Sequence, residues 1–485
     1  MDTLNSVIVD VNDVFWNWLL IPLVVVAGVY FTVRTGVVQV RMLPEMFRVV
    51  TEKGPTAADG KKSVSAFGAF SISAAARVGT GNIAGVATAI SVGGPGAVFW
   101  MWAMATVGAA SAFVESTLAQ LYKRRENEPG TFRGGPAYYM EYGLRRRWQG
   151  LAFAVIITVT FGFVFNAVQA NTIVATARAS LSALDGDWFA LVVGLCLITL
   201  LGLVIFGGVR RISHITEVLV PLMAIVYLLL GIAVVALNIT DLPRVLADIV
   251  GGAFGVREVV GGGIGTALAQ GIRRGMFSNE AGLGSSPNAA AAANVSHPVK
   301  QGLVQSLGVY FDTLLICSIT AFIILTTDPD LSERRSADLT QSALQASLGD
   351  WAGHVLTAVV FLLAFSSMIG NFYYGRANIE FITTRPQVLT AFRILVLVAV
   401  FGGALGSVSL IWNLADVFMG VMALVNLAAI IPLGAVAFRL LADYRAQRGA
   451  GEDPVYVHSA DIADPGGVQC WQATIASSLP GKPTQ

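Results

Sequence analysis

The chain has 485 residues, of which 55% are hydrophobic and 13% are charged, and its mean hydropathy is +0.68. Soluble domains carry roughly 25% charged residues, so this composition excludes an ordinary soluble domain and predicts an all-α polytopic membrane protein. The net charge of +1 argues against a nucleic-acid partner. Three scattered cysteines and four separated histidines indicate neither a disulfide framework nor a metal cluster.

About eleven apolar segments are long enough to cross a hydrocarbon core of about 30 Å. The N-terminus lacks the basic region and the small-residue cleavage site of a signal peptide, so we expect the first segment to be retained as a membrane helix. In chain order, the segments are 14–33, 64–90, 94–122, 151–180, 187–209, 214–237, 258–285, 300–326, 353–381, 389–407 and 410–440.

The connections between the segments differ in charge. Those after the first, third and fifth segments are rich in arginine and lysine, whereas the loops LDGDW, NITDLP and TTDPDLSERRSADL are acidic or mixed. With an odd number of spans, all basic connections fall on one side, which is the positive-inside pattern. We therefore expect a protein of the bacterial inner membrane with its N-terminus outside and its C-terminus in the cytoplasm.

Two segments, 64–90 and 258–293, contain far more glycine and polar residues than the others. Unwound backbone in lipid leaves N–H and C=O groups unsatisfied, so it persists only where it lines a cavity or binds a ligand. When the first span is set aside, these segments are the first and sixth of ten helices. That is the arrangement of an inverted five-plus-five repeat with two discontinuous helices.

This pattern divides the chain into four parts. Residues 1–63 contain the extra N-terminal transmembrane helix and a cytoplasmic linker, residues 64–240 form the first repeat, and residues 241–441 form the second. Residues 442–485 are polar and rich in glycine, aspartate and proline, so we expect a disordered cytoplasmic tail.

The first interruption is the stretch ARVGTGNIAG, residues 76–85. Its three glycines are spaced almost like a dinucleotide-binding loop, but no strand precedes them and no ribose-binding acid follows in a βαβ unit. Arg77, Thr80 and Asn82 accompany the glycines, which favours a ligand site over close helix packing. For the glycines at 261–265 alone, packing and binding stay equally open.

Several blocks of the chain resemble the alanine/glycine:cation symporter family. They are RVGTGNIAGVATAISVGGPGAVFWMW (77–102), FVESTLAQLYK (113–123), GGPAYYM (134–140), VQANT (168–172) and GMFSNEAGLGSSPNAAAAA (275–293). The similarity runs over most of residues 10–440. That family belongs to the amino acid–polyamine–cation group and has the leucine-transporter-like inverted-repeat fold, so the resemblance implies sodium-driven uptake of small neutral amino acids.

The resemblance also implies where the coupling sodium ion binds. In this fold the ion nearest the hinge lies between the break of core helix one and hydroxyl groups of core helix eight. The matching groups are the carbonyls of Ala75 and Val78 and the side chains of Ser366 and Ser367. Several neutral oxygens bind a hard cation such as sodium without holding it too tightly. The alternative is that the serines only bond back to the preceding helical turn.

The amino acid is expected beside the same break. Its carboxylate fits the amides around Thr80, Gly81 and Asn82, helped by the helix-end dipole, and Ser367 is counted with this site as well as with sodium. Its ammonium group needs acceptors, for which the exposed carbonyls of the second broken helix near residues 271–275 are the candidates.

Core helix three adds the sequence FNAVQANT. Asn166 and Gln169 are three residues apart and share one helix face, so both can point inward. We favour Gln169 as the residue that faces the substrate, ahead of Asn166 and Asn171. The alternative is that these buried amides hold helices together.

Core helix eight departs from the family pattern. Members often read GWSYYGE where this chain reads GNFYYGR, residues 370–376. Asn371 lies one turn after Ser367, where the family's tryptophan closes the pocket. An amide there enlarges the pocket and makes glutamine a credible substrate; alternatively, Phe372 or Tyr373 takes over the wall.

Ionisable residues at membrane depth rarely face lipid and usually pair with one another or line a pathway. Arg77 with Glu280 or Asp312 is a candidate for a gate on the cytoplasmic side, and the alternative is a set of structural ion pairs. The full set is Arg77, Glu115, Glu217, Arg273, Arg274, Glu280 and Asp312.

The sequence therefore predicts a symporter that binds sodium and a small neutral amino acid and works by alternating access. A sodium-gated channel or sensor on the same helices is the alternative from another class. An enzyme is not indicated, because the chain contains no HExxH, GxSxG or paired aspartate motif.

Overall fold

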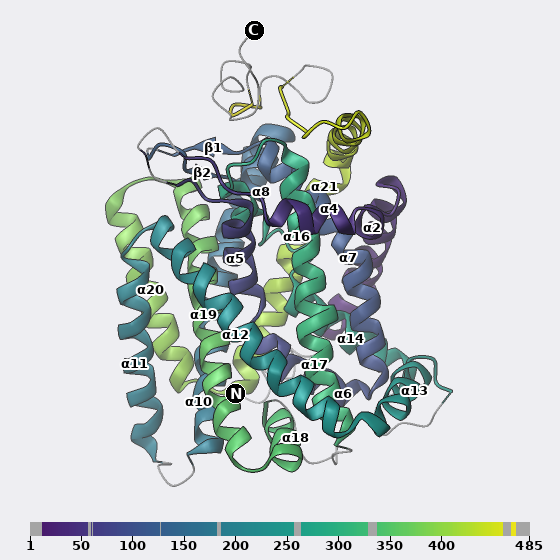
Figure 1. Cartoon of the computed structure of the whole chain (residues 1–485). Helices are drawn as coiled ribbons and strands as arrows, with labels where there is room; N and C mark the ends of the chain where they lie inside the picture. Colours follow the sequence, from purple (N-terminus) through teal and green to yellow (C-terminus); the bar gives the residue numbers. More distant parts are fainter. Residues whose placement is uncertain are drawn as a thin grey trace.

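A computed structural model describes residues 12–56, 60, 62–126, 128–181, 186–256, 263–327, 337–458 and 467–471. Long helices run side by side between two ends of the molecule (Figure 1). The end with strands β1 (Arg124–Arg125) and β2 (Phe132–Arg133) and the C-terminal residues is called the tail side. The end with helices α13 (Leu242–Ala253) and α18 (Ala337–Leu348) is called the far side.

Nine uninterrupted helical segments of the described chain are long and apolar enough to cross a membrane, and each overlaps a predicted span. They are built from η1 (Phe15–Leu20) with α2 (Ile21–Arg34), α7 (Gly96–Leu121), α9 (Arg147–Ile157) with η4 (Thr158–Phe165) and α10 (Asn166–Ser180), α11 (Asp187–Ile205), α12 (Val209–Leu237), α16 (Pro298–Val309) with η7 (Tyr310–Cys317) and α17 (Ser318–Thr326), α19 (Trp351–Ile382), α20 (Pro386–Leu405) and α21 (Val408–Gly449). The segments η1, η4 and η7 are π-helical.

The two remaining predicted spans are interrupted helices. The first consists of α5 (Ala66–Arg77) and α6 (Ala84–Gly93), and the second of α14 (Gly263–Asn279) and α15 (Pro287–Ala292). Helix α14 packs against α6 and α15 packs against α5, so the two interrupted helices lie side by side and run in opposite directions. The predicted polytopic helical fold, with two discontinuous spans, is confirmed.

The structure also contains short elements that the hydropathy pattern does not predict. Helices α13 and α18 replace expected far-side loops, and α3 (Val38–Arg41), α4 (Leu43–Val50) and α8 (Pro136–Tyr138) lie on the tail side. Strands β1 and β2 pair antiparallel as a small hairpin. All these elements are far shorter than the roughly 20 residues of a membrane span, which is why a search for spans does not detect them.

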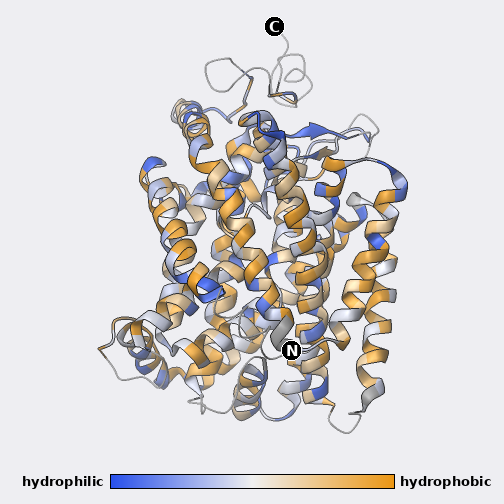
Figure 2. Cartoon of the chain, turned by 180° about the vertical axis from the view of Figure 1, so that it is seen from behind, coloured by the Kyte–Doolittle hydropathy of each residue, from blue (hydrophilic) through white to orange (hydrophobic). Residues whose placement is uncertain are grey.

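Large apolar side chains point outward from the helices at the edge of the bundle. Leu203 of α11, Leu229 of α12 and Val398 of α20 are 64%, 63% and 60% exposed. Figure 2 shows the outer helices largely in orange, the hydrophobic end of its scale. Polar residues such as Gln120 and Asn426 are fully buried instead. The arrangement places lipid around the bundle and polar chemistry inside it.

Part of the chain after residue 441 packs against the tail side. The Tyr456 amide donates to the Ser296 carbonyl at 2.9 Å, and the Trp471 indole donates to the Gln120 carbonyl at 3.0 Å. Tyr456 and Trp471 are 2% and 5% exposed. The disorder expected from residue 442 onward therefore does not extend to these residues, because buried aromatic side chains fix them in place.

Candidate functional site

The first interrupted helix unwinds directly after α5. Val78 is extended, with φ −79° and ψ 91°, and Gly79 follows at φ −143° and ψ −149° before a single 3-10 turn, Thr80–Asn82. A Cβ atom at position 79 would lie 2.3 Å from Ser367 Oγ, so a larger residue there would force the Ser367 side chain or α19 to shift. The interruption predicted at this motif is confirmed.

The unwound amides bond to side chains instead of to their own helix. The Gly79 amide donates to Asn82 Oδ1 at 2.9 Å, whereas in a continuous helix it would donate to the Ala75 carbonyl. The Thr80 amide likewise donates to Gln169 Oε1 at 3.2 Å. The Ala75 carbonyl is therefore released from helical pairing, which is the condition for acting as a cation ligand.

The two predicted serines of α19 differ in position. Ser367 Oγ lies 3.3 Å from the Val78 carbonyl, at the break, and 3.0 Å from the Leu363 carbonyl. Ser366 Oγ also donates to the Leu363 carbonyl, at 2.8 Å, but its other partner is Met223 Sδ of α12 at 3.2 Å. The structure thus brings Ser367 to the break and directs Ser366 toward α12.

The predicted amides of α10 separate into two groups. Asn166 Nδ2 donates to the Gly162 carbonyl at 3.0 Å, and its Oδ1 accepts from Asn371 Nδ2 at 3.2 Å. Asn171 Nδ2 donates to the Gly403 carbonyl of α20 at 3.1 Å. Asn166, like Gln169, therefore lies among the predicted site residues, while Asn171 ties α10 to α20.

Asn371 is 1% exposed, and its Oδ1 has no hydrogen-bond partner among the described residues. The neighbouring aromatic rings face elsewhere. Phe372 stacks on Phe392 of α20, with ring centroids 5.6 Å apart, and the Tyr373 hydroxyl donates to the Asn288 carbonyl of α15 at 3.4 Å. The Asn371 amide, and neither of these rings, makes the hydrogen bond to Asn166.

Asn82 braces the break against the second half of the chain. Its Nδ2 donates to Asp312 Oδ1 at 2.6 Å, and Asp312 Oδ2 accepts from Ser278 at 2.8 Å and from Thr313 at 2.9 Å. The Asn82 side chain is therefore fully engaged in this conformation. The Thr80 hydroxyl, by contrast, is buried without a partner among the described residues.

The second interrupted helix unwinds between α14 and α15. Glu280 adopts a left-handed backbone conformation with φ +57°. The amides of Gly282 and Gly284 donate to the two carboxylate oxygens of Glu115 at 3.3 and 3.1 Å, and Asn426 Nδ2 donates to the same carboxylate at 2.7 Å. A buried carboxylate of α7 thus satisfies the unwound amides of this break.

The carbonyls near residues 271–275, expected to receive an ammonium group, lie inside the uninterrupted α14. Carbonyls within a helix are already paired with amides four residues later. Gly271 and Gly275 pack against Ala97 and Met101 of α7. These glycines therefore serve close helix contact, and the expectation of exposed carbonyls at this position is not met.

Arg77 is 2% exposed, and its Nη1 donates to the Gln305 carbonyl at 3.4 Å. Its charge interacts with the carboxylates of Glu280, Glu115 and Asp312. Among the described residues, however, no carboxylate lies within the 4.0 Å of an ion pair. The direct pair with Glu280 or Asp312 that a gate would need is not formed in this conformation.

The other ionisable residues of the spans have structural partners. Arg274 forms a buried ion pair with Asp416 of α21, and Arg273 pairs with Asp13 at 2.7 Å. Glu217 accepts from the serine one turn earlier at 3.2 Å. The two arginine pairs fix α14 to α21 and to the N-terminal segment.

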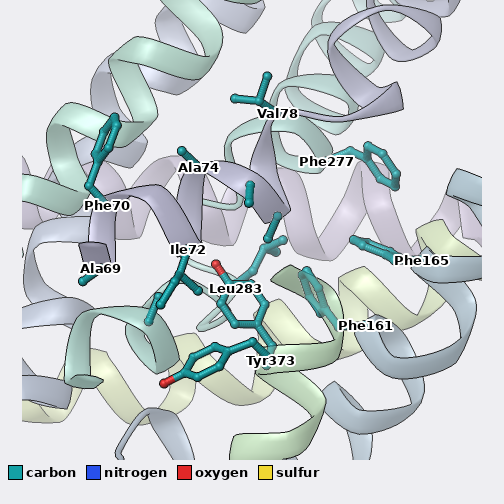
Figure 3. Packing of buried hydrophobic residues seen from close by; sticks show 14 of the residues in the cluster. Ala69, Phe70, Ile72, Ala74, Val78, Phe161, Phe165, Phe277, Leu283 and Tyr373 are labelled. Carbon is teal, nitrogen blue, oxygen red and sulfur yellow. The ribbon is translucent and has the colours of Figure 1, made fainter. Parts of the chain in front are cut away.

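An aromatic wall adjoins the polar groups of the first break. The ring centroid of Phe277 lies 4.9 Å from that of Phe165 and 5.0 Å from that of Trp412, and Phe165 lies 4.6 Å from Phe161. Figure 3 shows Phe161, Phe165 and Phe277 following one another beside the break. A Cβ atom at Gly81 would lie 2.8 Å from the Phe277 ring. Apolar walls with a few convergent polar groups are typical of small-ligand sites.

The sequence patterns do not predict three residues of this region, all of which lie on α21: Trp412, Asp416 and Asn426. Asp416 lies within an apolar span. It can therefore be detected as an ionisable residue at membrane depth, which is the criterion that identifies Asp312. Trp412 and Asn426 carry no local signal, because their roles depend on partners such as Glu115, 311 positions away from Asn426.

A family model described as the sodium:alanine symporter family matches residues 1–458. The chain belongs to the sodium:alanine symporter family. The protein is therefore a sodium-coupled amino-acid symporter of the membrane and not an enzyme, which sets aside the channel and sensor alternative.

Relatives of the symporter are similar over nearly their whole length. The probable sodium/glutamine symporter GlnT of Bacillus subtilis is 50% identical over 472 residues, which cover 96% of each chain. The amino-acid carrier protein AlsT of the same organism is 50% identical over 454 residues, covering 93% of this chain and 94% of AlsT. The sodium/alanine symporter AgcS of Methanococcus maripaludis is 36% identical over 439 residues, covering 89% and 95%.

Among solved structures, the symporter resembles MhsT, crystallised with L-phenylalanine, with a TM-score of 0.54. The two chains are 15% identical, and the match covers 78% of this chain and 89% of MhsT. At this identity the likeness concerns the fold alone, and it confirms the leucine-transporter-like fold that the resemblance implies.

Replacing Gly79 by alanine tests the close approach of α19. The new Cβ would lie 2.3 Å from Ser367 Oγ and 3.1 Å from Gln169 Oε1, so one of these groups must move. Overpacking costs about 1–3 kcal/mol, so we expect sodium-dependent amino-acid binding to weaken about tenfold or more. Gly85→Ala is the matched control, because its Cβ meets no atom closer than 4.0 Å. Equal binding by the wild type and Gly79→Ala would contradict the expectation.

Proposed function

We propose that this symporter takes up small neutral amino acids, alanine and glycine foremost, together with sodium, through a site between the two interrupted helices. The observation that carries the proposal is the released backbone of the first break in contact with Ser367 and Gln169. Neutral carbonyl and hydroxyl oxygens suit sodium, and amides near a helix end suit a carboxylate.

We assign sodium to the carbonyls of Ala75 and Val78 and to the hydroxyls of α19. Ser367 supports this assignment directly, since its Oγ already lies 3.3 Å from the Val78 carbonyl. Ser366 would have to exchange Met223 for the ion by a side-chain rotation. Sodium held between the break and α19 would fix the two elements to each other and so order the site for the amino acid.

We assign the substrate carboxylate to Thr80, Gly81 and Asn82, with Gln169 and Asn166 along one side. The Thr80 hydroxyl supports this assignment because it is buried without a partner among the described residues. Sodium and substrate would share one unwound turn, so each should tighten binding of the other. When one elementary charge crosses the membrane, a membrane potential of about 100 mV supplies about 2.3 kcal/mol of free energy. A tenfold sodium gradient adds about 1.4 kcal/mol. One-to-one coupling then sustains accumulation of up to several hundredfold.

Glutamine is a second candidate substrate, and Asn371 favours it. The Asn371 Oδ1 is a buried acceptor to which none of the described residues donates, and a carboxamide side chain offers it an N–H donor. Two relatives at 50% identity are compatible with this candidate, one named a probable sodium/glutamine symporter and the other an amino-acid carrier.

We also propose that the tail side faces the cytoplasm, with residues 64–240 and 241–441 as the two repeats and the N-terminus outside. The tail side carries Arg124, Arg125 and Arg133 on the hairpin and exposed Arg145 and Arg146 before α9, in agreement with the positive-inside pattern.

Uptake into proteoliposomes tests the transported ligands. With an imposed inward sodium gradient, radiolabelled alanine and glycine should accumulate above equilibrium, and replacing sodium by potassium should abolish accumulation. Glutamine is measured in parallel. Absence of sodium-dependent accumulation of all three amino acids would overturn the proposed substrates.

Asn371→Trp tests the pocket wall. The indole is much larger than the amide that contacts Asn166, so we expect glutamine uptake to fall about tenfold or more while alanine uptake persists. Asn371→Ala keeps the space but removes the acceptor, and it separates pocket size from hydrogen bonding. A parallel loss of both substrates, or no loss of glutamine uptake, would count against the assignment.

A reporter fused after Gln485 tests the orientation. A fluorescent protein that matures only in the cytoplasm should be bright there, and alkaline phosphatase, which is active only outside, should be inactive at the same position. The opposite pair of results would reverse the proposed topology.

A further inference from the structure

A polar cavity of about 630 Å³ opens on the tail side, away from the interrupted helices. Four arginines line it: Arg124 and Arg125 of β1, Arg133 of β2 and Arg147 at the start of α9. Figure 2 shows the hairpin in blue, the hydrophilic end of its scale, above the apolar bundle. Neither the sodium site nor the amino-acid site uses these residues.

The carboxylates around the cavity do not balance its arginines. Glu141 pairs with Arg147 at 2.7 Å, and Glu380 pairs with Arg376 at 2.8 Å. Glu126 lies close enough to Arg133 for their charges to interact. The lining of the cavity itself therefore holds four guanidinium groups, of Arg124, Arg125, Arg133 and Arg147, against two carboxylates, of Glu141 and Glu380, and keeps an excess of positive charge.

Within the part of the chain that the structure describes, two polar groups at the cavity lack partners. Tyr138 is 4% exposed and lines the cavity, and its hydroxyl has no hydrogen-bond partner among the described residues. The Arg133 Nε is buried and likewise unpaired. The Tyr138 ring packs edge-on against Phe381, 5.0 Å between centroids, so its position is fixed. Buried donors without acceptors are costly and indicate that an acceptor binds there.

The walls of the cavity are held in place by neighbouring contacts. The Arg124 guanidinium lies 3.6 Å from the ring centroid of Tyr142 and donates to the Gly467 carbonyl at 2.9 Å. Val468 and Gln469, which follow in the packed part of the tail, complete the lining. The donors are therefore organised before any ligand arrives.

The cavity adjoins the end of a helix that is long and apolar enough to cross a membrane. Arg147 begins the span that includes α9 and also lines the cavity. The next residue, Trp148, is 69% exposed, and in membrane proteins tryptophan gathers where the membrane meets water. Basic cavities at the ends of transmembrane helices bind phosphate headgroups of lipids.

We propose that this cavity binds a phosphate-bearing anion, either the headgroup of an anionic phospholipid or a soluble phosphate. Arginine guanidinium groups match phosphate oxygens in paired hydrogen bonds, and the Tyr138 hydroxyl adds a neutral donor. The anion neutralises the excess charge and satisfies the two unpaired donors. It also bridges the hairpin, α9 and the packed tail, which all contribute to the lining.

Binding to the purified full chain tests the proposal without a transport measurement. Delipidated protein in neutral detergent is titrated with phosphatidylglycerol, with phosphatidylcholine and with inorganic phosphate, and bound ligand is followed by native mass spectrometry and thermal shift. We expect phosphatidylglycerol or phosphate to bind and phosphatidylcholine to bind at least tenfold more weakly. If inorganic phosphate saturates the cavity, the ligand is a soluble phosphate. If phosphatidylglycerol binds and inorganic phosphate does not, the ligand is the headgroup of a lipid.

Three variants locate the site. Arg133→Gln should raise the Kd about tenfold, and Tyr138→Phe, which keeps the ring packing, should raise it several-fold. Arg146→Gln is the matched control, because it removes the same charge from an exposed position that does not line the cavity. Absence of binding by both anions would overturn the proposal. Equal weakening by Arg146→Gln and Arg133→Gln, or full binding by Tyr138→Phe, would also overturn it.

Discussion

The structure depends on one constraint: a helix that unwinds inside a membrane must satisfy its backbone groups from within the protein. The amides of Gly79 and Thr80 meet this constraint through side-chain oxygens of Asn82 and Gln169. Those contacts fix the position of α10 and of the 3-10 turn relative to α5. They also release the carbonyls of the last turn of α5, which is what makes the break chemically useful.

The two breaks meet the constraint in different ways. At the second break, the buried carboxylate of Glu115 occupies the amides of Gly282 and Gly284, and Asn426 binds both Glu115 and the Gly282 carbonyl. The protein thus supplies its own anion there. At the first break the amides of Gly79 and Thr80 bond to neutral side-chain oxygens, and the carboxylate of Asp312 bonds to the Asn82 side chain and not to the unwound amides. This asymmetry explains why the proposed site lies on one break although the fold has two.

The sequence predicts what depends on local composition and leaves open what depends on distant partners. Glycines and polar residues within an apolar run reveal the break after α5, and adjacent serines reveal a polar face of α19. The second break is misplaced toward residues 271–275, because those glycines also fit an unwound helix and only their packing on α7 shows otherwise. The rotation of α19 separates Ser366 from Ser367, and no local pattern encodes that rotation. The contacts of Asn426 and Trp471 join elements hundreds of residues apart.

The bracing of Asn82 has a consequence for how the chain is made. Its side chain bonds to Asp312 and its carbonyl accepts from Thr320, partners that follow 230 and 238 positions later. A ribosome adds about 5–20 residues per second, so the first break waits roughly 10–50 s for these partners. During that interval its polar backbone has no finished interior to occupy. Until then, the polar backbone groups of the first break must form hydrogen bonds with water or with the insertion machinery. The order of synthesis therefore becomes part of how this protein folds.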